Sequence, residues 1–251
     1  MKSKLLNNHG FNKWIKDFYN NKAKNITRGD YEYFRWFSNK KKIRQYEQTI
    51  RSLNFHLRNM EFKDCLDVGC GPGTWTFLLL NKYKEARFTC LDISKEMILQ
   101  FKKRINESRI SFIVSSFIDY DIKKTYDFIF CSRSIDYMEN KPLVIKRMYQ
   151  SLCNGGKGMI ITSPPHPKLL KIKKIFGKEI NLQHTERISA KEMKALLNEN
   201  RFINIEFFPI LFTDYLPETI NKFFFNNFYK RQLNLISKIF TSSYIVKFEK
   251  P

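Results

Sequence analysis

The sequence predicts a doubly wound α/β fold around a mostly parallel, seven-stranded sheet. Two observations predict it. From Asp64 onward, short apolar runs alternate with helical patterns, which is typical of βαβ units around a parallel sheet. The first of these runs leads directly into a glycine-rich turn and then into a helix. A length of 251 residues suits one large domain, or one domain with an appendage.

The first part of the chain is expected to form a helical cap over residues 1–60, apart from a core over residues 61–251. Within the cap, apolar side chains recur at three- and four-residue steps and give one apolar stripe, at Ile43, Tyr46, Ile50, Leu53 and Leu57. This spacing predicts a helix that lies against the core.

Five apolar runs are predicted as the first strands of the sheet, at residues 64–68, 87–91, 110–114, 126–131 and 157–162. The helices between them have recognisable ends. Ser94 caps a helix, and a helix over residues 140–153 is expected to stop at Asn154-Gly155-Gly156. Ser189 and Glu192 form a capping box for a further helix, which should end near Asn200 in the left-handed conformation.

Two more strands are predicted at residues 203–208 and 243–248, and an insertion over about residues 209–241 separates them. The insertion is too long for a hairpin loop. Its apolar positions have helical spacing, so we expect helices that act as a lid or as an edge layer. Its Lys and Phe residues leave peripheral membrane contact as an alternative.

The chain is strongly basic, because 45 Lys and Arg against 24 Asp and Glu give a net charge of +21. Such a charge attracts nucleic acid, anionic lipid or an acidic substrate. The lysines are scattered along the chain, so a bias in residue usage explains the charge equally well.

Five cysteines without a CxxC pair indicate neither a zinc site nor a disulfide framework, and no metal is expected. We interpret them as buried thiols. No apolar run approaches the roughly 18 residues of a membrane span, and the Lys-rich start lacks the apolar segment of a signal peptide. We therefore expect a cytoplasmic protein.

The glycine-rich turn is the strongest functional signal. Glycines at positions 69, 71 and 73 let the chain turn tightly and let a ligand lie against the backbone. Asp67, two residues before the first glycine, would repel a pyrophosphate but would suit a cationic amino group. Asp92 ends the second strand, where a carboxylate can accept hydrogen bonds from ribose hydroxyls. A nucleoside ligand without phosphates fits this pattern best.

Two stretches, Leu66-Asp67-Val68-Gly69-Cys70-Gly71-Pro72-Gly73-Thr74 and Leu91-Asp92-Ile93-Ser94, resemble the first two motifs of class I S-adenosylmethionine-dependent methyltransferases of the small-molecule type. More loosely, residues 126–132 resemble the family's fourth strand, and residues 152–156 resemble the turn before its fifth. The resemblance covers about residues 60–208. It implies a Rossmann-like fold, S-adenosylmethionine as cofactor and methyl transfer as the activity.

The resemblance also implies roles for individual residues. Asp67 would orient the amino group of the cofactor, Asp92 would hold the ribose and Ile93 would lie on the adenine. The family often has an aspartate at the end of the third strand, where this chain has Ser116, so the Ser116 hydroxyl or the Phe117 N–H would replace it. The full set of expected cofactor contacts is Asp67, Gly69, Cys70, Gly71, Gly73, Asp92, Ile93, Met97, Ser116, Phe117 and Cys131.

Asp136 and His184 are the predicted catalytic residues. Asp136 follows the fourth strand, where such folds place residues over the methyl group, and it could accept a proton from the acceptor. It could equally cap a turn or pair with a lysine. His184 lies shortly before the helix capped by Ser189, and histidines in similar positions of related enzymes face the pocket; His166 is the weaker candidate.

The expected function is methyl transfer to an O, N or C nucleophile of a small or lipid-like acceptor. An RNA methyltransferase is the alternative, since the net charge could hold phosphates. Enzymes that methylate base amino groups carry a Pro-Pro motif after the fourth strand, whereas Pro164-Pro165 follows the fifth, which disfavours a base substrate. A non-catalytic module that binds a nucleoside is a third reading. The sequence names neither the acceptor nor the oligomeric state.

Overall fold

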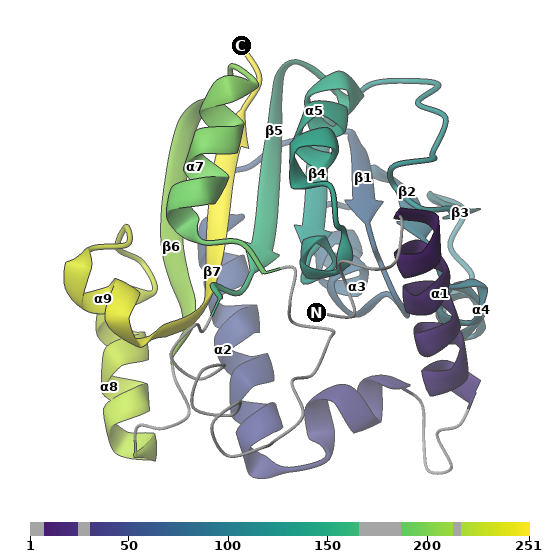
Figure 1. The fold of residues 1–251 in the computed structure, drawn as a ribbon. Coiled ribbons are helices and arrows are strands. Elements are labelled where there is room, and N and C mark those ends of the chain that lie inside the picture. The colour runs from purple at the N-terminus through teal and green to yellow at the C-terminus, as the bar shows by residue number, and fades with distance from the viewer. Residues whose placement is uncertain (1–7, 25–30, 166–186, 213–216) are drawn as a thin grey trace.

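The computed structural model describes residues 8–24, 31–165, 187–212 and 217–251. A seven-stranded sheet lies between two layers of helices, with α5 and α7 in front of it and α2 and α3 behind (Figure 1). The strand order is β3-β2-β1-β4-β5-β7-β6. β1 to β5 are parallel, and β7 runs antiparallel between β5 and β6. The predicted fold class is confirmed.

All seven strands occur where the sequence predicts them. β1 (Asp64–Val68) and β3 (Ile110–Val114) have the predicted bounds. The others are longer than predicted: β2 (Arg87–Asp92), β4 (Tyr126–Ser132), β5 (Leu152–Thr162), β6 (Ile203–Phe212) and β7 (Thr241–Glu249).

The largest difference between the predicted and the observed elements is at the start of β5. The preceding helix α5 (Lys141–Ser151) ends before the predicted stop at residues 154–156. Gly155 has a φ of 74° and donates its N–H to the Lys250 carbonyl at 2.9 Å. The glycines therefore lie in a strand irregularity that pairs with the end of the chain, and they do not terminate the helix.

The predicted helix caps are present. Ser94 accepts the Met97 N–H at the start of α4 (Lys95–Arg104), and Ser189 and Glu192 form the capping box of α7 (Ala190–Glu199). α7 ends at Asn200, its C-cap, as predicted, but the left-handed conformation falls on the next residue, since the φ of Asn200 is −92° and that of Arg201 is 63°.

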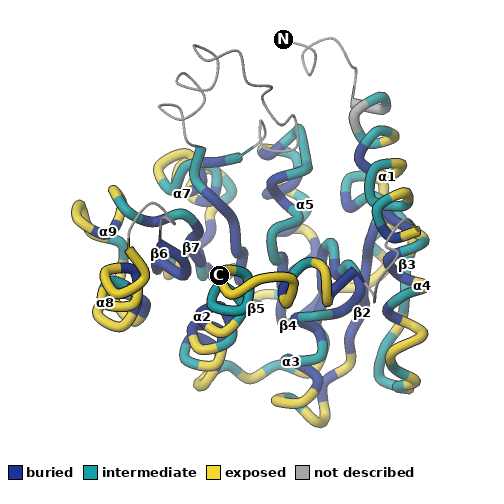
Figure 2. The backbone as a smooth tube through the Cα atoms, turned by 90° about the horizontal axis from the view of Figure 1, so that it is seen from below, coloured by how far each residue is buried: buried dark blue, intermediate teal, exposed yellow. Residues whose placement is uncertain are grey.

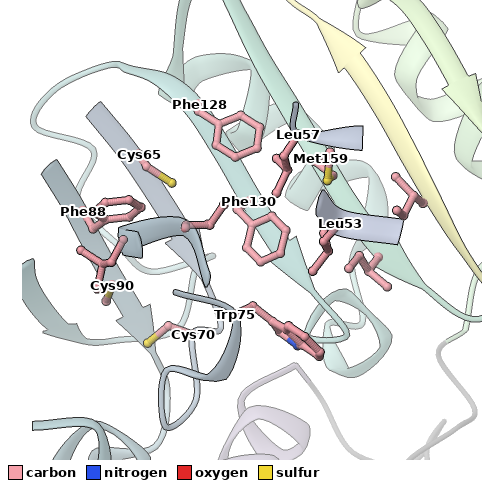
Figure 3. Close-up of a cluster of buried hydrophobic side chains, with 14 of the residues drawn as sticks. Leu53, Leu57, Cys65, Cys70, Trp75, Phe88, Cys90, Phe128, Phe130 and Met159 are labelled. Carbon is pink, nitrogen blue, oxygen red and sulfur yellow. The ribbon is translucent and has the colours of Figure 1, made fainter. Parts of the chain in front are cut away.

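The N-terminal helices are not a separate layer. They comprise α1 (Asn8–Lys24), the short π-helix η2 (Tyr33–Phe37) and α2 (Lys40–His56). Leu53 and Leu57 are fully buried in the main core, where Figure 3 shows them beside Met159 and Phe130. α1 packs along α4 at the other end of the sheet (Figures 1 and 2). The predicted cap at residues 1–60 is thus part of the core packing.

Each face of the sheet has its own hydrophobic cluster. One contains side chains of α2, α3 (Thr74–Lys82) and α4, together with Phe128 and Phe130 of β4. The other contains side chains of α5 and α7 against Ile129 and Ile160. This alternation along β4 is what a strand covered on both sides requires. Seen from below, the buried strands lie between the two layers (Figure 2).

The insertion before the last strand forms two helices, α8 (Glu218–Phe228) and α9 (Leu235–Phe240). Their buried faces pack against β6 and α2 around a small aromatic cluster, Phe212, Phe225 and Tyr229, with Phe55, Phe224, Phe228 and Phe240 at its border. The predicted helices are therefore present, but as an edge layer on β6. Among the described residues, no helix is long and apolar enough to span a membrane.

Candidate active site

A pocket lies at the carboxyl ends of the parallel strands, where ligands bind in open α/β sheets. Its floor comes from the turns after β1, β2, β3 and β4, and α1 and η2 cover it. The short 3-10 helix η3 (Ile135–Tyr137), which follows β4, contributes Tyr137. None of the described residues of α8 and α9 lines this pocket, so the prediction that the insertion closes over it was wrong.

The three glycines of the turn after β1 all have positive φ, at 73°, 55° and 88°. A Cβ on Gly69 would lie 2.2 Å from the Ser134 Cβ, and a Cβ on Gly73 would lie 2.3 Å from the Phe101 ring. A Cβ on Gly71 would meet nothing within 4 Å, although Gly71 lines the pocket. Gly69 and Gly73 therefore allow close packing, and Gly71 leaves space for a ligand.

Asp92, at the end of β2, connects the glycine turn to the next helix. Its Oδ2 accepts the Gly71 N–H at 2.8 Å, and its Oδ1 accepts the Ser94 N–H at 2.8 Å. Burial raises the pKa of Asp92 to about 6, although these two backbone hydrogen bonds lower it. The side chain lines the pocket, and each carboxylate oxygen keeps a further lone pair for a ligand hydroxyl.

Asp67 is one of the least exposed charged residues and lies below the pocket rather than on its wall. Only 2% of it is exposed, and its Oδ2 accepts the Thr76 hydroxyl at 2.6 Å. Burial raises its pKa to about 7, opposed by the Thr76 hydrogen bond and supported by the charge of Asp92. The predicted role, orienting the amino group of a cofactor, stays a prediction.

Most of the other predicted cofactor contacts come together on the pocket wall, namely Cys70, Ile93, Met97, Ser116 and Phe117. The Ser116 hydroxyl donates to Asp119 at 2.6 Å and accepts the Asp119 N–H at 3.1 Å. Cys131 does not reach the wall, because it is fully buried and its Sγ lies 3.0 Å from the Ser134 Oγ. The described cysteines are free thiols, four of them buried.

Asp136, a predicted catalytic residue, is buried but does not line the pocket. It accepts a hydrogen bond from the Thr162 hydroxyl at the end of β5. Burial raises its pKa, opposed by the Thr162 hydrogen bond and the positive charges of Arg187 and Lys141. Its contacts favour a structural role, although the hydrogen bond links η3 to β5 and is neither the turn cap nor the lysine pair that was the alternative. His184, the other predicted catalytic residue, and His166 lie outside the described residues.

Sequence reasoning missed the residues that cover the pocket. They come from the N-terminal helices, the start of α3 and the loop after β4: Tyr19, Tyr31, Glu32, Arg35, Trp36, Trp75, Arg133 and Tyr137. The N-terminal helices were expected to lie against the core, but none of these individual residues was predicted as a pocket residue. The run Tyr33-Phe34-Arg35-Trp36-Phe37 was the available signal, because an arginine among aromatic residues is unusual on a plain packing helix.

Residues 65–156 match the family model of the methyltransferase domain. The matched stretch contains the glycine turn, Asp92 and the strand β4. Over these residues the chain is similar to a methyltransferase domain.

The malonyl-[acyl-carrier protein] O-methyltransferase of Priestia megaterium is 31% identical to this chain over 115 residues, which are 46% of this chain and 42% of that protein. The (S)-coclaurine N-methyltransferase of Thalictrum flavum subsp. glaucum is 27% identical over 116 residues, which are 44% of this chain and 32% of that protein. The matches thus span less than half of these curated relatives.

Solved structures of methyltransferases share the fold of this chain. The N-methyltransferase NodS of Bradyrhizobium japonicum, in complex with S-adenosyl-L-homocysteine, has a TM-score of 0.61 at 15% identity, over 94% of this chain and 98% of that chain. The magnesium protoporphyrin IX methyltransferase of Synechocystis has a TM-score of 0.61 at 14% identity, over 96% of this chain and 100% of that chain. At these identities the likeness concerns the fold.

Proposed function

We propose that this chain transfers the methyl group of S-adenosylmethionine to an O, N or C nucleophile of a small or lipid-like acceptor. The observation that carries the proposal is the position of Asp92. Its carboxylate holds the backbone of the glycine turn and still presents oxygens to the pocket. This arrangement suits a nucleoside whose ribose hydroxyls donate hydrogen bonds.

The wall residues fit the cofactor in two further respects. The space above Gly71 is open to a ligand, and any side chain at this position would fill it. Ile93, Met97 and Phe117 give an apolar wall beside Asp92, which suits the flat faces of an adenine. Bound S-adenosylmethionine would supply an activated methyl group.

The chain's own contribution is positioning. Displacement at an activated methyl carbon depends on alignment, and a general base is optional. The walls from α1 and η2, with Tyr19 and Trp36, exclude water and narrow the paths by which an acceptor can approach. The predicted roles of Asp136 and His184 in catalysis remain proposals, and the buried hydrogen bond of Asp136 favours a structural role for it.

Transfer of radiolabel tests the proposal. The protein is incubated with methyl-labelled S-adenosylmethionine and with separate small-molecule, lipid and RNA fractions of a cell extract. We expect label in the small-molecule or lipid fraction, and none with Asp92→Asn. Label in the RNA fraction alone would replace the acceptor class with RNA, and no label in any fraction would count against methyl transfer.

RNA remains the second acceptor class, and the net charge of +21 is the observation in its favour. Phosphate contacts release counterions, so RNA affinity should fall steeply with salt. Gel shifts with tRNA and rRNA fragments test this. No shift at low salt would remove RNA from consideration.

We also propose that the outer surface of α8 and α9 contacts an anionic membrane, since Leu235 and Ile239 are 80% and 69% exposed. The exposed basic residues of this surface are Lys222, Lys230, Arg231 and Lys238. Cationic helices with exposed apolar residues bind the membrane interface. Co-sedimentation with anionic but not zwitterionic vesicles is expected, and Leu235→Ser with Ile239→Ser should abolish it. The cytoplasmic location stays a prediction.

A further inference from the structure

Arg133 is a charged residue in an unusual place. It directly follows β4, lines the pocket and has a φ of 59°, which costs energy for a residue with a side chain. Its N–H donates to the Ile161 carbonyl at 2.8 Å, which fixes the backbone against β5. The loop therefore holds this arginine at the carboxyl ends of β4 and β5, next to the glycine turn.

The guanidinium of Arg133 is poorly satisfied by the protein. One Nη2–H donates to the Thr49 hydroxyl at 3.3 Å, and the buried Nε has no hydrogen-bond partner. Burial, followed by the charge of Arg35, lowers the pKa of Arg133 to about 9. Asp136 is the carboxylate whose charge acts on Arg133, but it lies off the pocket wall.

Arg35 of η2 brings a second guanidinium to the same place. The two guanidinium carbons lie 5.0 Å and 5.3 Å from the ring centre of Trp36, so both arginines contact this indole. Both arginines line the pocket. Over the described ranges, neither Arg35 nor Arg133 forms an ion pair with a carboxylate. Two neighbouring cations without a directly paired carboxylate repel each other.

The formal charges of the pocket wall and of the cofactor indicate which charge the acceptor should carry. The described charges on the pocket wall are those of Glu32, Arg35, Asp92 and Arg133, which cancel formally. S-Adenosylmethionine adds one net positive charge, from a sulfonium and an ammonium against one carboxylate. An acceptor with a negative group would balance the site, and arginine is the side chain suited to a carboxylate or a phosphate.

We infer that the methyl acceptor carries an anionic group, a carboxylate or a phosphate, held by Arg35 and Arg133 beside Trp36. This inference rests on the proposed function, since it names the acceptor class of the same pocket. Arg133 would then be a specificity-determining residue. The competing explanation is that Arg133 holds the carboxylate of the cofactor itself.

Calorimetry on protein saturated with S-adenosylhomocysteine tests the inference. The saturated protein is titrated with sodium succinate and sodium phosphate, with sodium chloride as the ionic-strength control. We expect at least one of the two anions to bind. Arg133→Met should weaken this binding by about tenfold or more, because it removes the positive charge, and Arg133→Lys by less, because it keeps that charge. Arg87 lies at the end of β2 that is away from the pocket. Arg87→Met is the matched control and should leave anion binding unchanged.

A second titration shows whether Arg133 binds the anionic group of the acceptor or the carboxylate of the cofactor. S-Adenosylhomocysteine carries the amino-acid carboxylate, and 5′-methylthioadenosine lacks it. If Arg133→Met leaves the ratio of their affinities unchanged within about threefold, the arginine serves the acceptor. If the variant weakens only S-adenosylhomocysteine, the arginine serves the cofactor and the inference is wrong. Absence of anion binding, or equal binding by Arg133→Met, overturns it too. Failure of the wild-type protein to bind S-adenosylhomocysteine would contradict the proposed function itself.

Discussion

At the scale of single residues, the pKa of Asp92 predicts how ligand binding depends on pH. Because burial raises this pKa to about 6, the carboxyl group becomes protonated as the pH falls below 6. A protonated group is a weaker acceptor for ribose hydroxyls. Affinity for S-adenosylhomocysteine should therefore be constant above pH 7 and decline below pH 6, by up to about tenfold per pH unit.

Two variants identify the carboxyl group that makes the ligand affinity depend on pH. Asp92→Asn should bind weakly with a flat profile, because it removes the titrating carboxyl group. Asp67→Asn should keep the decline, since Asp67, with its pKa of about 7, lies below the pocket wall. Calorimetric titrations between pH 5 and pH 8 measure both. A wild-type profile that is flat over this range would contradict the role given to Asp92.

The three glycines should differ when each is replaced by alanine. Gly73→Ala and Gly69→Ala introduce contacts of 2.3 Å and 2.2 Å, so both should lower the melting temperature strongly. Gly71→Ala meets no neighbour, so it should cost only the roughly 1–2 kcal/mol of left-handed backbone. Its methyl group would enter the pocket and should weaken S-adenosylhomocysteine binding in a folded protein. Equal effects of the three substitutions on stability and affinity would contradict this division.

The residues of the glycine turn and Asp92 could be predicted from sequence because their backbone roles follow from chain order. The contacts of Asp67 could not, since Thr76 competes for its carboxylate only after α3 is packed. Arg133 was missed for a similar reason. Its orientation depends on Thr49 and Trp36, more than eighty residues away in the chain.

At the scale of elements, α8 should contribute to stability and not to binding. Phe225 is 1% exposed and stacks on Tyr229 at a centroid distance of 4.6 Å. Phe225→Ala should lower the free energy of unfolding by about 3–5 kcal/mol, through lost burial and a cavity. Because no described residue of α8 lines the pocket, S-adenosylhomocysteine affinity of the folded variant should be unchanged.

The exposed Phe223 is the control for this prediction, because it lies on the same helix with 62% of its surface exposed. Phe223→Ala should leave the free energy of unfolding within about 0.5 kcal/mol of the wild type. Urea unfolding and calorimetry of both variants give the answer. A loss of ligand affinity in folded Phe225→Ala would restore the lid that the sequence suggested.

Strand and helix positions could be predicted well because periodicity and caps are local. The Ser189 capping box and the Ser94 cap lie in neighbouring residues and were visible in the sequence. The start of β5 was not, because residues 152–156 pair with Lys250 at the far end of the chain. The packing side of the insertion also depends on α2, which is distant in the sequence and whose Gln48 amide donates to the Asn221 side-chain oxygen of α8.

At the scale of the whole molecule, α1 covers the pocket because polar side chains tie its end to α4. The Gln100 amide donates to the Ala23 carbonyl at 2.9 Å, and its Oε1 accepts the Tyr31 N–H at 3.4 Å. The Ser94 Oγ also lies 2.7 Å from the Asn20 Oδ1. Without these contacts the pocket would lose its upper wall.

Gln100→Leu should therefore loosen α1 without unfolding the core. We expect faster hydrogen exchange in residues 8–24 and faster release of S-adenosylhomocysteine, with amide protection in β1 and β4 unchanged. Exchange detected by mass spectrometry, with stopped-flow release kinetics, measures both. Exchange in α1 identical to that of the wild type would show that these hydrogen bonds do not hold the cover in place.

The central claim is that the pocket at the carboxyl ends of β1, β2 and β4 binds S-adenosylmethionine through Asp92. The most direct measurement is calorimetric titration of the purified chain with S-adenosylhomocysteine, alongside Asp92→Asn and the control Arg87→Met. We predict one-to-one binding by the wild type and by Arg87→Met, with a loss of at least about tenfold in Asp92→Asn. No binding by the wild type, or equal binding by Asp92→Asn, would contradict the account.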